Sequence, residues 1–173
     1  MSKEKAIEIL KEMFEQRNYT NVEYDGKDNI HARKPNGNPV LCMLDCIYCK
    51  LNIDNIKEKH EQLEKQNIKH CIIVYNETIT PAVKKDIPRF EKIGFRFELF
   101  QLDDLQFNCT KHSLVPKHTL LTPEETKYFK EQYGSNIPVL LHIDPIARFY
   151  GFLPGQIIRI TRRNGFISYR IVK

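Results

Sequence analysis

The sequence predicts two units, an α/β unit over residues 1–107 and a small α+β unit over residues 108–173. In the first unit, segments of helical period and short β-branched runs follow the order helix, three strands, helix, strand, helix, strand. That alternation is typical of helices layered on a mixed sheet. In the second unit, a capped helix, an extended segment and a hairpin follow one another. Charge divides near the same place: residues 1–110 hold 17 Lys/Arg against 18 Asp/Glu, whereas residues 111–173 hold 10 against 4.

The elements of the first unit follow from local signals. Ser2 can cap a helix that reaches about Arg17, because Ile7, Leu10 and Phe14 recur at helical spacing. The other predicted elements are a hairpin of 22–24 and 30–33, a nearly continuous apolar strand over 40–51, a helix from 53 to about 67, a strand over 71–75, a helix that starts after Thr80 and ends at Pro88, and a strand over 95–100.

The boundary between the units is predicted in the stretch 107–118, which has neither a helical nor a strand period and contains a proline. Thr122 and Glu125 then form the two ends of a capping box, with Pro123 in the first helical turn, and Gly134 is expected to end that helix. The remaining predicted elements are an extended segment over 137–143, a short helix begun by Asp144-Pro145, and a hairpin of 157–161 and 166–172 around Asn164-Gly165.

Composition limits the class of protein. Of the 173 residues 41% are hydrophobic and 28% are charged, which is typical of a folded chain. No apolar run approaches the roughly 18 residues that span a bilayer, and the N-terminus resembles no signal peptide, so we expect a soluble intracellular protein without a membrane partner. The basic excess of residues 111–173 suits an acidic protein surface or nucleic acid, although a merely solvated face would carry it equally well.

Three of the five cysteines have the spacing of a radical S-adenosylmethionine iron–sulfur site: Cys42, Cys46 and Cys49. They lie in an apolar run that predicts a strand, on which Cys49 would point away from the other two. A zinc site would need a fourth ligand such as His31 or His60. We therefore predict that these cysteines are reduced, small buried side chains, and that the chain holds no metal and no cofactor.

The element order of residues 1–107 also suits a restriction-endonuclease-like core, so nuclease chemistry is the alternative function. An active site of that kind needs an acid together with Asp/Glu-x-Lys on one strand, so that the carboxylates and the ammonium project together toward a divalent metal. The candidates are Asp45 with Lys50, Asp25-Gly26-Lys27, and Glu125-Thr126-Lys127. The first pair faces opposite sides of a strand, the second lies in a tight turn and the third on a helix of the other unit. We predict an inactive core and no enzyme.

From residue 108 onward the chain resembles a known family. The blocks that carry the resemblance are 108–118, Leu121-Thr122-Pro123-Glu124-Glu125, Ile137-Pro138, Asp144-Pro145-Ile146-Ala147-Arg148-Phe149-Tyr150-Gly151, Gly155-Gln156, Ile160-Thr161-Arg162 and Tyr169-Arg170. In this order and spacing they resemble the fifth subunit shared by eukaryotic nuclear RNA polymerases, whose C-terminal module is found by itself as a small subunit of archaeal RNA polymerase. Upstream, Thr80-Pro81-Ala82 resembles the family's Thr-Pro-x-Ala element.

The resemblance implies a non-catalytic subunit of a multisubunit DNA-directed RNA polymerase. Residues 1–107 would be its jaw domain, part of the lower jaw beside downstream double-stranded DNA, and residues 108–173 would dock on the largest subunit among the other polymerase subunits. The residues expected at the docking surface are Asp144, Pro145, Arg148, Phe149, Tyr150, Gly151, Arg162, Tyr169 and Arg170. Those expected near DNA, in weak and non-specific contact, are Thr80, Pro81, Lys84 and Lys85.

One departure from the family lies between Arg162 and Tyr169, where a longer Ser-Glu-Thr-Ala-Gly-type hairpin is usual and Arg163-Asn164-Gly165-Phe166 takes its place. The shortened hairpin, a divergent jaw and a composition rich in Lys, Asn and Ile suggest the version of a large DNA virus. The expected location is accordingly the nucleus, or the host cytoplasm and virion for a viral polymerase.

Overall fold

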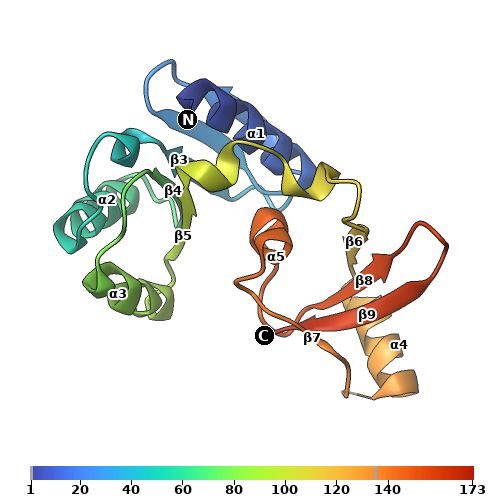
Figure 1. Ribbon diagram of the computed structural model, residues 1–173. Helices are drawn as coiled ribbons and strands as arrows, with labels where there is room; N and C mark the ends of the chain where they lie inside the picture. Colours follow the sequence, from blue (N-terminus) through green and yellow to red (C-terminus); the bar gives the residue numbers. More distant parts are fainter. Residues whose placement is uncertain (1, 135) are drawn as a thin grey trace. The chain divides into compact units, whose positions relative to one another are not determined.

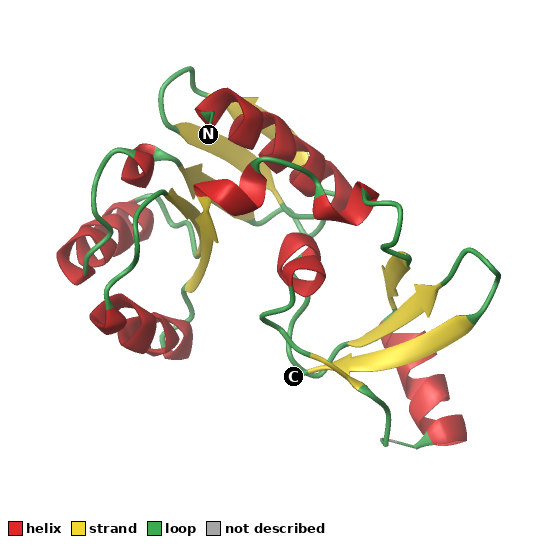
Figure 2. Ribbon diagram, viewed as in Figure 1, coloured by secondary structure: helices red, strands yellow, loops and turns green. Residues whose placement is uncertain are grey.

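The computed structural model describes residues 2–134 and 136–173. The chain divides into two compact units, residues 1–107 and 108–173, and each is described here by itself (Figure 1). Figure 2 shows that both units mix helices with strands. Across the described residues, no helix combines the length and the apolar character needed to cross a membrane.

The first unit is built on a five-stranded sheet in the order β1-β2-β3-β4-β5. The strands are β1 (Thr20–Tyr24), β2 (Asn29–Arg33), β3 (Pro39–Met43), β4 (His70–Tyr75) and β5 (Arg96–Gln101). The first three pair antiparallel through short turns, whereas β3, β4 and β5 run parallel and are joined by helices. The predicted mixed α/β layer and its element order are confirmed.

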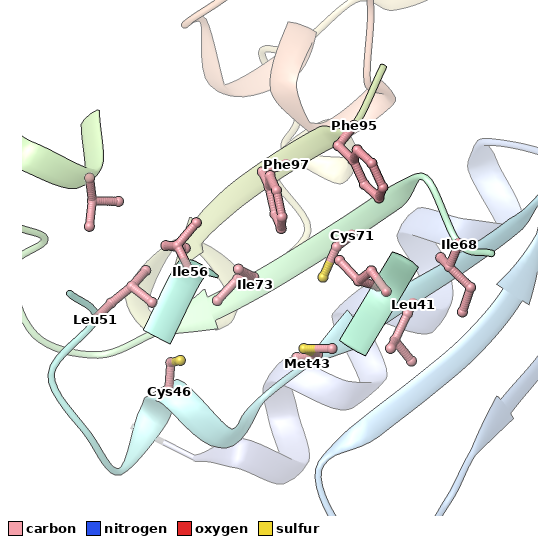
Figure 3. Packing of buried hydrophobic residues seen from close by; sticks show 12 residues of the cluster. Leu41, Met43, Cys46, Leu51, Ile56, Ile68, Cys71, Ile73, Phe95 and Phe97 are labelled. Atoms are coloured by element: carbon pink, nitrogen blue, oxygen red, sulfur yellow. The ribbon is translucent and has the colours of Figure 1, made fainter. Parts of the chain in front are cut away.

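Helices cover both faces of this sheet: α1 (Lys3–Gln16) lies on one side, and α2 (Ile53–Lys65) and α3 (Pro81–Lys92) lie on the other (Figure 1). Side chains alternate between the two faces along each strand. The α2/α3 face is the apolar cluster in Figure 3, which includes Leu41, Cys71 and Phe97 from three successive parallel strands. These alternating apolar positions hold the helices on the sheet.

Two predicted elements of this unit were wrong in extent. The strand predicted over 40–51 ends at Met43, and the chain turns through a 3₁₀ helix at Asp45–Ile47. The apolar run continues past the strand because Cys46, Ile47 and Leu51 are buried in the turn itself.

The predicted end of α3 at Pro88 was also wrong, since the helix continues to Lys92 with the proline inside it. Proline removes one helical hydrogen bond and normally ends or kinks a helix. Here Ile87 and Phe90, on either side of it, pack against the apolar cluster of Figure 3. Tertiary packing therefore keeps the last turn helical.

The second unit has a four-stranded sheet in the order β6-β8-β9-β7. Its elements are β6 (Lys117–Leu120), α4 (Pro123–Tyr133), β7 (Val139–Leu140), α5 (Pro145–Tyr150), β8 (Ile157–Thr161) and β9 (Ile167–Val172). The capping box at Thr122 and Glu125 and the hairpin around Asn164-Gly165 are confirmed. Two predictions were wrong: the extended segment of 137–143 shortens to β7, and 107–118, expected without structure, contains the start of β6 and a 3₁₀ turn at Cys109–Lys111.

Candidate docking and nucleic-acid surfaces

Helix α5 is a short, firmly capped helix at one corner of the second unit. The Asp144 carboxylate accepts a hydrogen bond of 2.8 Å from the backbone N–H of Ile146, and Pro145 occupies the first turn, where its missing N–H costs nothing. Gly151 ends the helix with φ 67°, a left-handed conformation that glycine adopts without strain. Six residues could not hold a helix alone, so caps and packing fix it.

The side chains of α5 divide between core and surface. Ala147 and Phe149 are buried, and Ala147 belongs to the small apolar cluster of the C-terminal sheet. Tyr150 stacks on Phe152 with ring centroids 5.1 Å apart, and burial raises the pKa of its phenol although a hydrogen bond with Thr110 opposes the shift. Arg148 is half-buried. Ala147 and Phe149 therefore anchor the helix, and the half-buried Arg148 lies between them.

The hairpin residues of the predicted docking set lie in two different environments. Arg162 is exposed at the tip, where its backbone N–H donates to the carbonyl of Phe166 at 2.9 Å. Tyr169 packs against Phe129 with ring centroids 4.4 Å apart, and Arg170 Nη1 donates to the carbonyl of Val139 at 2.9 Å. Tyr169 and Arg170 thus help to hold helix α4 and strand β7 to the hairpin, whereas Arg162 faces solvent.

Exposed apolar side chains gather on the second unit. Of twelve large exposed hydrophobic residues in the described chain, nine lie within residues 108–173, although this unit is the smaller one. They are Leu114, Leu120, Tyr128, Tyr133, Leu141, Ile143, Leu153, Phe166 and Ile167. Large contiguous apolar patches mark protein interfaces, so these side chains are the candidates for such a patch. Two of them, Ile143 and Leu153, come just before and just after helix α5 with its caps Asp144 and Gly151, a segment called the α5 corner below.

The residues predicted near DNA lie at the start of α3. Thr80 caps the helix by accepting the backbone N–H of Val83, and Pro81 is its first residue. Lys84 and Lys85 are exposed, and they follow the helix N-terminus, whose unpaired N–H groups attract anions. The structure thus brings all four predicted residues to one exposed helix start.

The carboxylates weighed for nuclease chemistry are occupied by structural contacts. Asp45 pairs with Lys59 of α2 rather than with Lys50. Asp25 accepts backbone hydrogen bonds from Lys27 and Asn29 and closes the β1–β2 turn. Glu125 completes the capping box of α4 by accepting the backbone N–H of Thr122. Each carboxylate therefore has a local partner that explains its position.

The cysteines do not share a strand, so the alternation argument used for them was wrong for two of the three. Cys42 lies in β3, Cys46 is buried in the 3₁₀ turn among the apolar cluster of Figure 3, and Cys49 is exposed beyond it. Burial raises the pKa of the Cys46 thiol to about 12 and raises that of Cys42 as well. Within residues 2–134 and 136–173, no three His, Cys, Asp or Glu side chains are grouped so that they could hold a metal ion.

Sequence reasoning missed a buried charged cluster on the first unit. Glu98 of β5 accepts two hydrogen bonds from Arg17, at 3.1 and 2.8 Å, and its Oε1 also lies 2.6 Å from His70 Nε2 and 3.0 Å from Arg96 Nη2. The side chains of Arg17 and Glu98 are only 2% and 11% exposed. The partners of Glu98 lie far away in the sequence, so spacing could not predict the cluster. The one available signal was a charged residue, Glu98, between apolar Phe97 and Leu99 of a predicted strand.

Three of the matches with known proteins differ in extent. Residues 107–172 match the family model described as RNA polymerase Rpb5, C-terminal domain. A putative DNA-directed RNA polymerase subunit, 454R, of Invertebrate iridescent virus 6 is 34% identical over an alignment of 185 positions that covers 98% of each chain. Subunit RPABC1 of DNA-directed RNA polymerases I, II and III from Caenorhabditis briggsae is 34% identical over 130 residues, and the match covers 71% of this chain and 61% of that relative.

Among solved structures, one match is the DNA-bound, ATP-dependent Type ISP restriction-modification enzyme LlaBIII. It is 18% identical, covers 78% of this chain and 10% of that one, and has a TM-score of 0.41. A similarity of this size does not establish a shared fold. The restriction-endonuclease-like description of residues 1–107 therefore stays a prediction.

These sequence matches first assign the chain to a class of proteins, the subunits of DNA-directed RNA polymerases. Within that class the chain belongs to the Rpb5 family, because the Rpb5 C-terminal domain model matches residues 107–172, RPABC1 subunits are among its relatives, and a viral polymerase subunit is matched along almost its whole length. The resemblance recognised in residues 108–173 is thereby confirmed, and a viral relative stands among the family members.

Proposed function

We propose that this chain is a non-catalytic subunit of a multisubunit DNA-directed RNA polymerase. In this proposal residues 108–173 dock on the largest subunit, and residues 1–107 form part of the lower jaw near downstream DNA. The observation that carries it is the coincidence, in residues 108–173, of the Rpb5 family match with most of the large exposed apolar side chains. The polymerase would act in the nucleus or, for a virus, in the host cytoplasm and virion.

The docking half of the proposal rests on the α5 corner and its charge. Buried Ala147 and Phe149 hold the helix in place, so the backbone that carries Arg148 has little conformational freedom left to lose on binding. Ile143 and Leu153, exposed apolar residues that flank α5 in the sequence, would add apolar contact area, and arginine among apolar groups is typical of interface hot spots. The 10 Lys/Arg against 4 Asp/Glu of residues 111–173 favour a partner surface with acidic groups.

Two of the predicted docking residues already have partners within the unit. Tyr169 packs on Phe129, and Arg170 donates to the carbonyl of Val139. We propose that they support the docking surface from within. Arg148 of α5 and the exposed Arg162 are the residues proposed to contact the partner.

The DNA half of the proposal rests on the start of α3. Lys84 and Lys85 add two charges to the partial positive charge of the helix N-terminus, and phosphate oxygens are the groups that such an arrangement attracts. Contacts of this kind position a duplex without reading its sequence, and they weaken as salt is added. We therefore propose weak, non-specific contact with downstream double-stranded DNA.

Affinity purification of the tagged full-length chain from cells that express its polymerase tests the proposal. The expected result is co-purification of the two largest polymerase chains at near-equal amounts. A matched pair of variants, Arg148→Ala at the α5 corner and Lys127→Ala on the exposed side of α4, separates docking from general charge effects. Absence of the large chains from the wild-type sample contradicts the proposed function.

A further inference from the structure

Two cysteines of the first unit, Cys46 and Cys49, come close together in the turn that follows β3. Both line one small pocket of about 70 Å³, and their thiols form a hydrogen bond with each other. Cys46 is buried and belongs to the apolar cluster of Figure 3, whereas Cys49 is exposed. One buried and one exposed sulfur therefore share a site.

The backbone of this turn has the geometry that a disulfide needs. Ile47 is the last residue of the 3₁₀ helix, and Tyr48 follows with φ −103° and ψ −3°, close to the values of a type I turn. In such a turn the first and fourth residues, here Cys46 and Cys49, have Cα atoms less than about 7 Å apart. Bridged cysteines usually have Cα atoms about 4.4–6.8 Å apart, so a bond between these sulfurs needs no large backbone movement.

Local contacts hold the turn in this arrangement. The backbone N–H of Tyr48 donates to the carbonyl of Asp45 at 3.2 Å, and the thiol of Cys49 donates to the same carbonyl, with its Sγ at 3.8 Å. The Asp45 carboxylate forms a salt bridge with Lys59, which fastens the turn to α2. The turn is thus fixed at Asp45 and at the buried Cys46, and Cys49 is its exposed end.

The two sulfurs differ in their access to reagents. Burial raises the pKa of Cys46 to about 12, although the ammonium of Lys59 attracts its thiolate and opposes the shift. Cys46 is therefore protected from reagents in solution, while the exposed Cys49 is open to them. This division is typical of a peroxide-sensitive pair, in which an accessible thiolate is oxidised first and a neighbouring cysteine then forms the disulfide.

We propose that Cys46 and Cys49 are a modification site, at which a hydroperoxide converts the two thiols into a reversible disulfide. The Cys49 thiolate attacks one oxygen of the peroxide, the O–O bond breaks, and an alcohol leaves while Cys49 becomes a sulfenic acid. The Cys46 sulfur gives up its proton, forms the S–S bond and displaces the sulfenic hydroxyl as water. In sum, two thiols and one hydroperoxide give one disulfide, one alcohol and one water, and two electrons pass from sulfur to the peroxide. A dithiol reductant reverses the bond by exchange.

Two other roles compete for these thiols. A zinc ion needs four ligands, and the described residues hold no group of three His, Cys, Asp or Glu side chains at this turn or elsewhere. The other possibility is a bond between Cys46 and Cys71 of β4, which belongs to the same apolar cluster. Both of those sulfurs are fully buried, so neither can meet an oxidant first, whereas Cys49 can.

Treatment of the reduced full-length chain with hydrogen peroxide, followed by unfolding, alkylation of the remaining thiols and peptide mass spectrometry, tests the proposal. The expected product has Cys46 and Cys49 linked and Cys42 of the same peptide alkylated, and dithiothreitol should restore both linked thiols. In Cys46→Ala the sulfenic acid of Cys49 has no neighbouring thiol to react with. Its labelling by dimedone should therefore rise about 10-fold above that of the wild type.

Substitution of an exposed cysteine keeps the test independent of folding. Cys49→Ser should abolish the linkage and leave Cys46 reduced, whereas Cys109→Ser, at the half-exposed cysteine of the other unit, should leave the linkage unchanged. Phenylarsine oxide, which bridges two neighbouring thiols without an oxidant, should bind the wild type about 10-fold more tightly than Cys49→Ser.

Three results would overturn the proposal. The first is oxidation of Cys49 to a sulfinic acid or to an intermolecular disulfide while Cys46 remains open to alkylation. The second is a bond between Cys46 and Cys71. The third is a Cys46 and Cys49 pair that stays reduced in peroxide, or equal binding of the arsenical by the wild type and Cys49→Ser.

Discussion

The guanidinium of Arg17 donates two hydrogen bonds, of 3.1 and 2.8 Å, to the carboxylate of Glu98, which lies 81 residues further along the chain. Arg17 caps the carboxyl end of α1, and Glu98 lies in the middle of β5, so the pair fastens the first helix to the last strand of the unit. Both side chains are nearly removed from water. Such a pair has a large cost when one partner is removed, because the other charge is left buried.

The first prediction is that Glu98→Ala destabilises the N-terminal unit by about 3–5 kcal/mol, because the substitution leaves the buried charge of Arg17 without its partner. Urea unfolding monitored by circular dichroism measures this. Glu91→Ala, at an exposed position of α3, is the matched control and should change the unfolding free energy by less than about 0.5 kcal/mol. A Glu98→Ala value as small as the control value would show that the pair contributes little.

The second prediction is that the N-terminal unit loses folding stability as the pH is lowered below about 6.5. His70 has a folded pKa lowered to about 4, below the ordinary 6.5, and the guanidinium of Arg17 helps to hold the pKa of Glu98 well below its usual range. For both groups the unfolded chain binds protons more readily, so stability is full above about pH 6.5 and falls as the pH is lowered. His70 contributes a loss of up to about 3 kcal/mol between pH 6.5 and 4, at about 1.4 kcal/mol per pKa unit.

Urea midpoints measured from pH 7.5 to 4 check this prediction. The wild-type midpoint should be flat above pH 6.5 and fall steadily below it. In His70→Gln the slope between pH 6.5 and 4.5 should be clearly smaller, because the titrating imidazole has gone. Equal slopes for the two proteins would assign the acid sensitivity to other groups.

Local sequence signals predicted most of the secondary structure. Thr122 with Glu125, and Asn164 with Gly165, each act within four residues, so the helix start and the hairpin turn could be predicted without knowledge of the fold. The signals failed where distant packing decides. The end of β3 at Met43 and the helical residues after Pro88 depend on what each segment packs against.

The candidate sites divide in the same way. The α5 corner and the start of α3 are contiguous in sequence, so Arg148 and Lys84 could be named before the structure was known. The charged cluster around Glu98 brings together residues from the end of α1 and from strands β4 and β5. No spacing in the sequence links residues 17, 70 and 98, which come close only through the pairing of β4 with β5 and the packing of α1 on the sheet.

The third prediction concerns the thiols. Cys49 is exposed, whereas Cys46, Cys42 and Cys71 are buried and burial raises the pKa of each thiol. Because thiolates are the reactive form, a disulfide reagent at pH 8 should modify Cys49 at least 100-fold faster than the three buried thiols. Peptide mass spectrometry over time measures it, with the half-exposed Cys109 expected to react at an intermediate rate. Fast modification of Cys46 would indicate that the 3₁₀ turn opens.

The fourth prediction is that residues 108–173 fold alone. The fragment carries its own capped helix, its own four-stranded sheet and its own apolar clusters around Ile158 and Phe129. We expect dispersed amide resonances and a cooperative thermal transition, and we expect the fragment to bind the largest polymerase subunit. If residues 1–107 bind that subunit and the fragment does not, the roles proposed for the two units are reversed.

The last prediction is that Arg148→Ala weakens docking without unfolding the chain. The fold should survive because Ala147 and Phe149 supply the core contacts of α5, while Arg148 is only half-buried. A guanidinium held at an interface by a rigid helix commonly contributes about 2 kcal/mol, which corresponds to a roughly 30-fold weaker Kd for the largest subunit. Biolayer interferometry measures it, with Lys127→Ala expected to bind like wild type. An Arg148→Ala affinity equal to that of Lys127→Ala, at an unchanged melting temperature, would remove Arg148 from the docking surface.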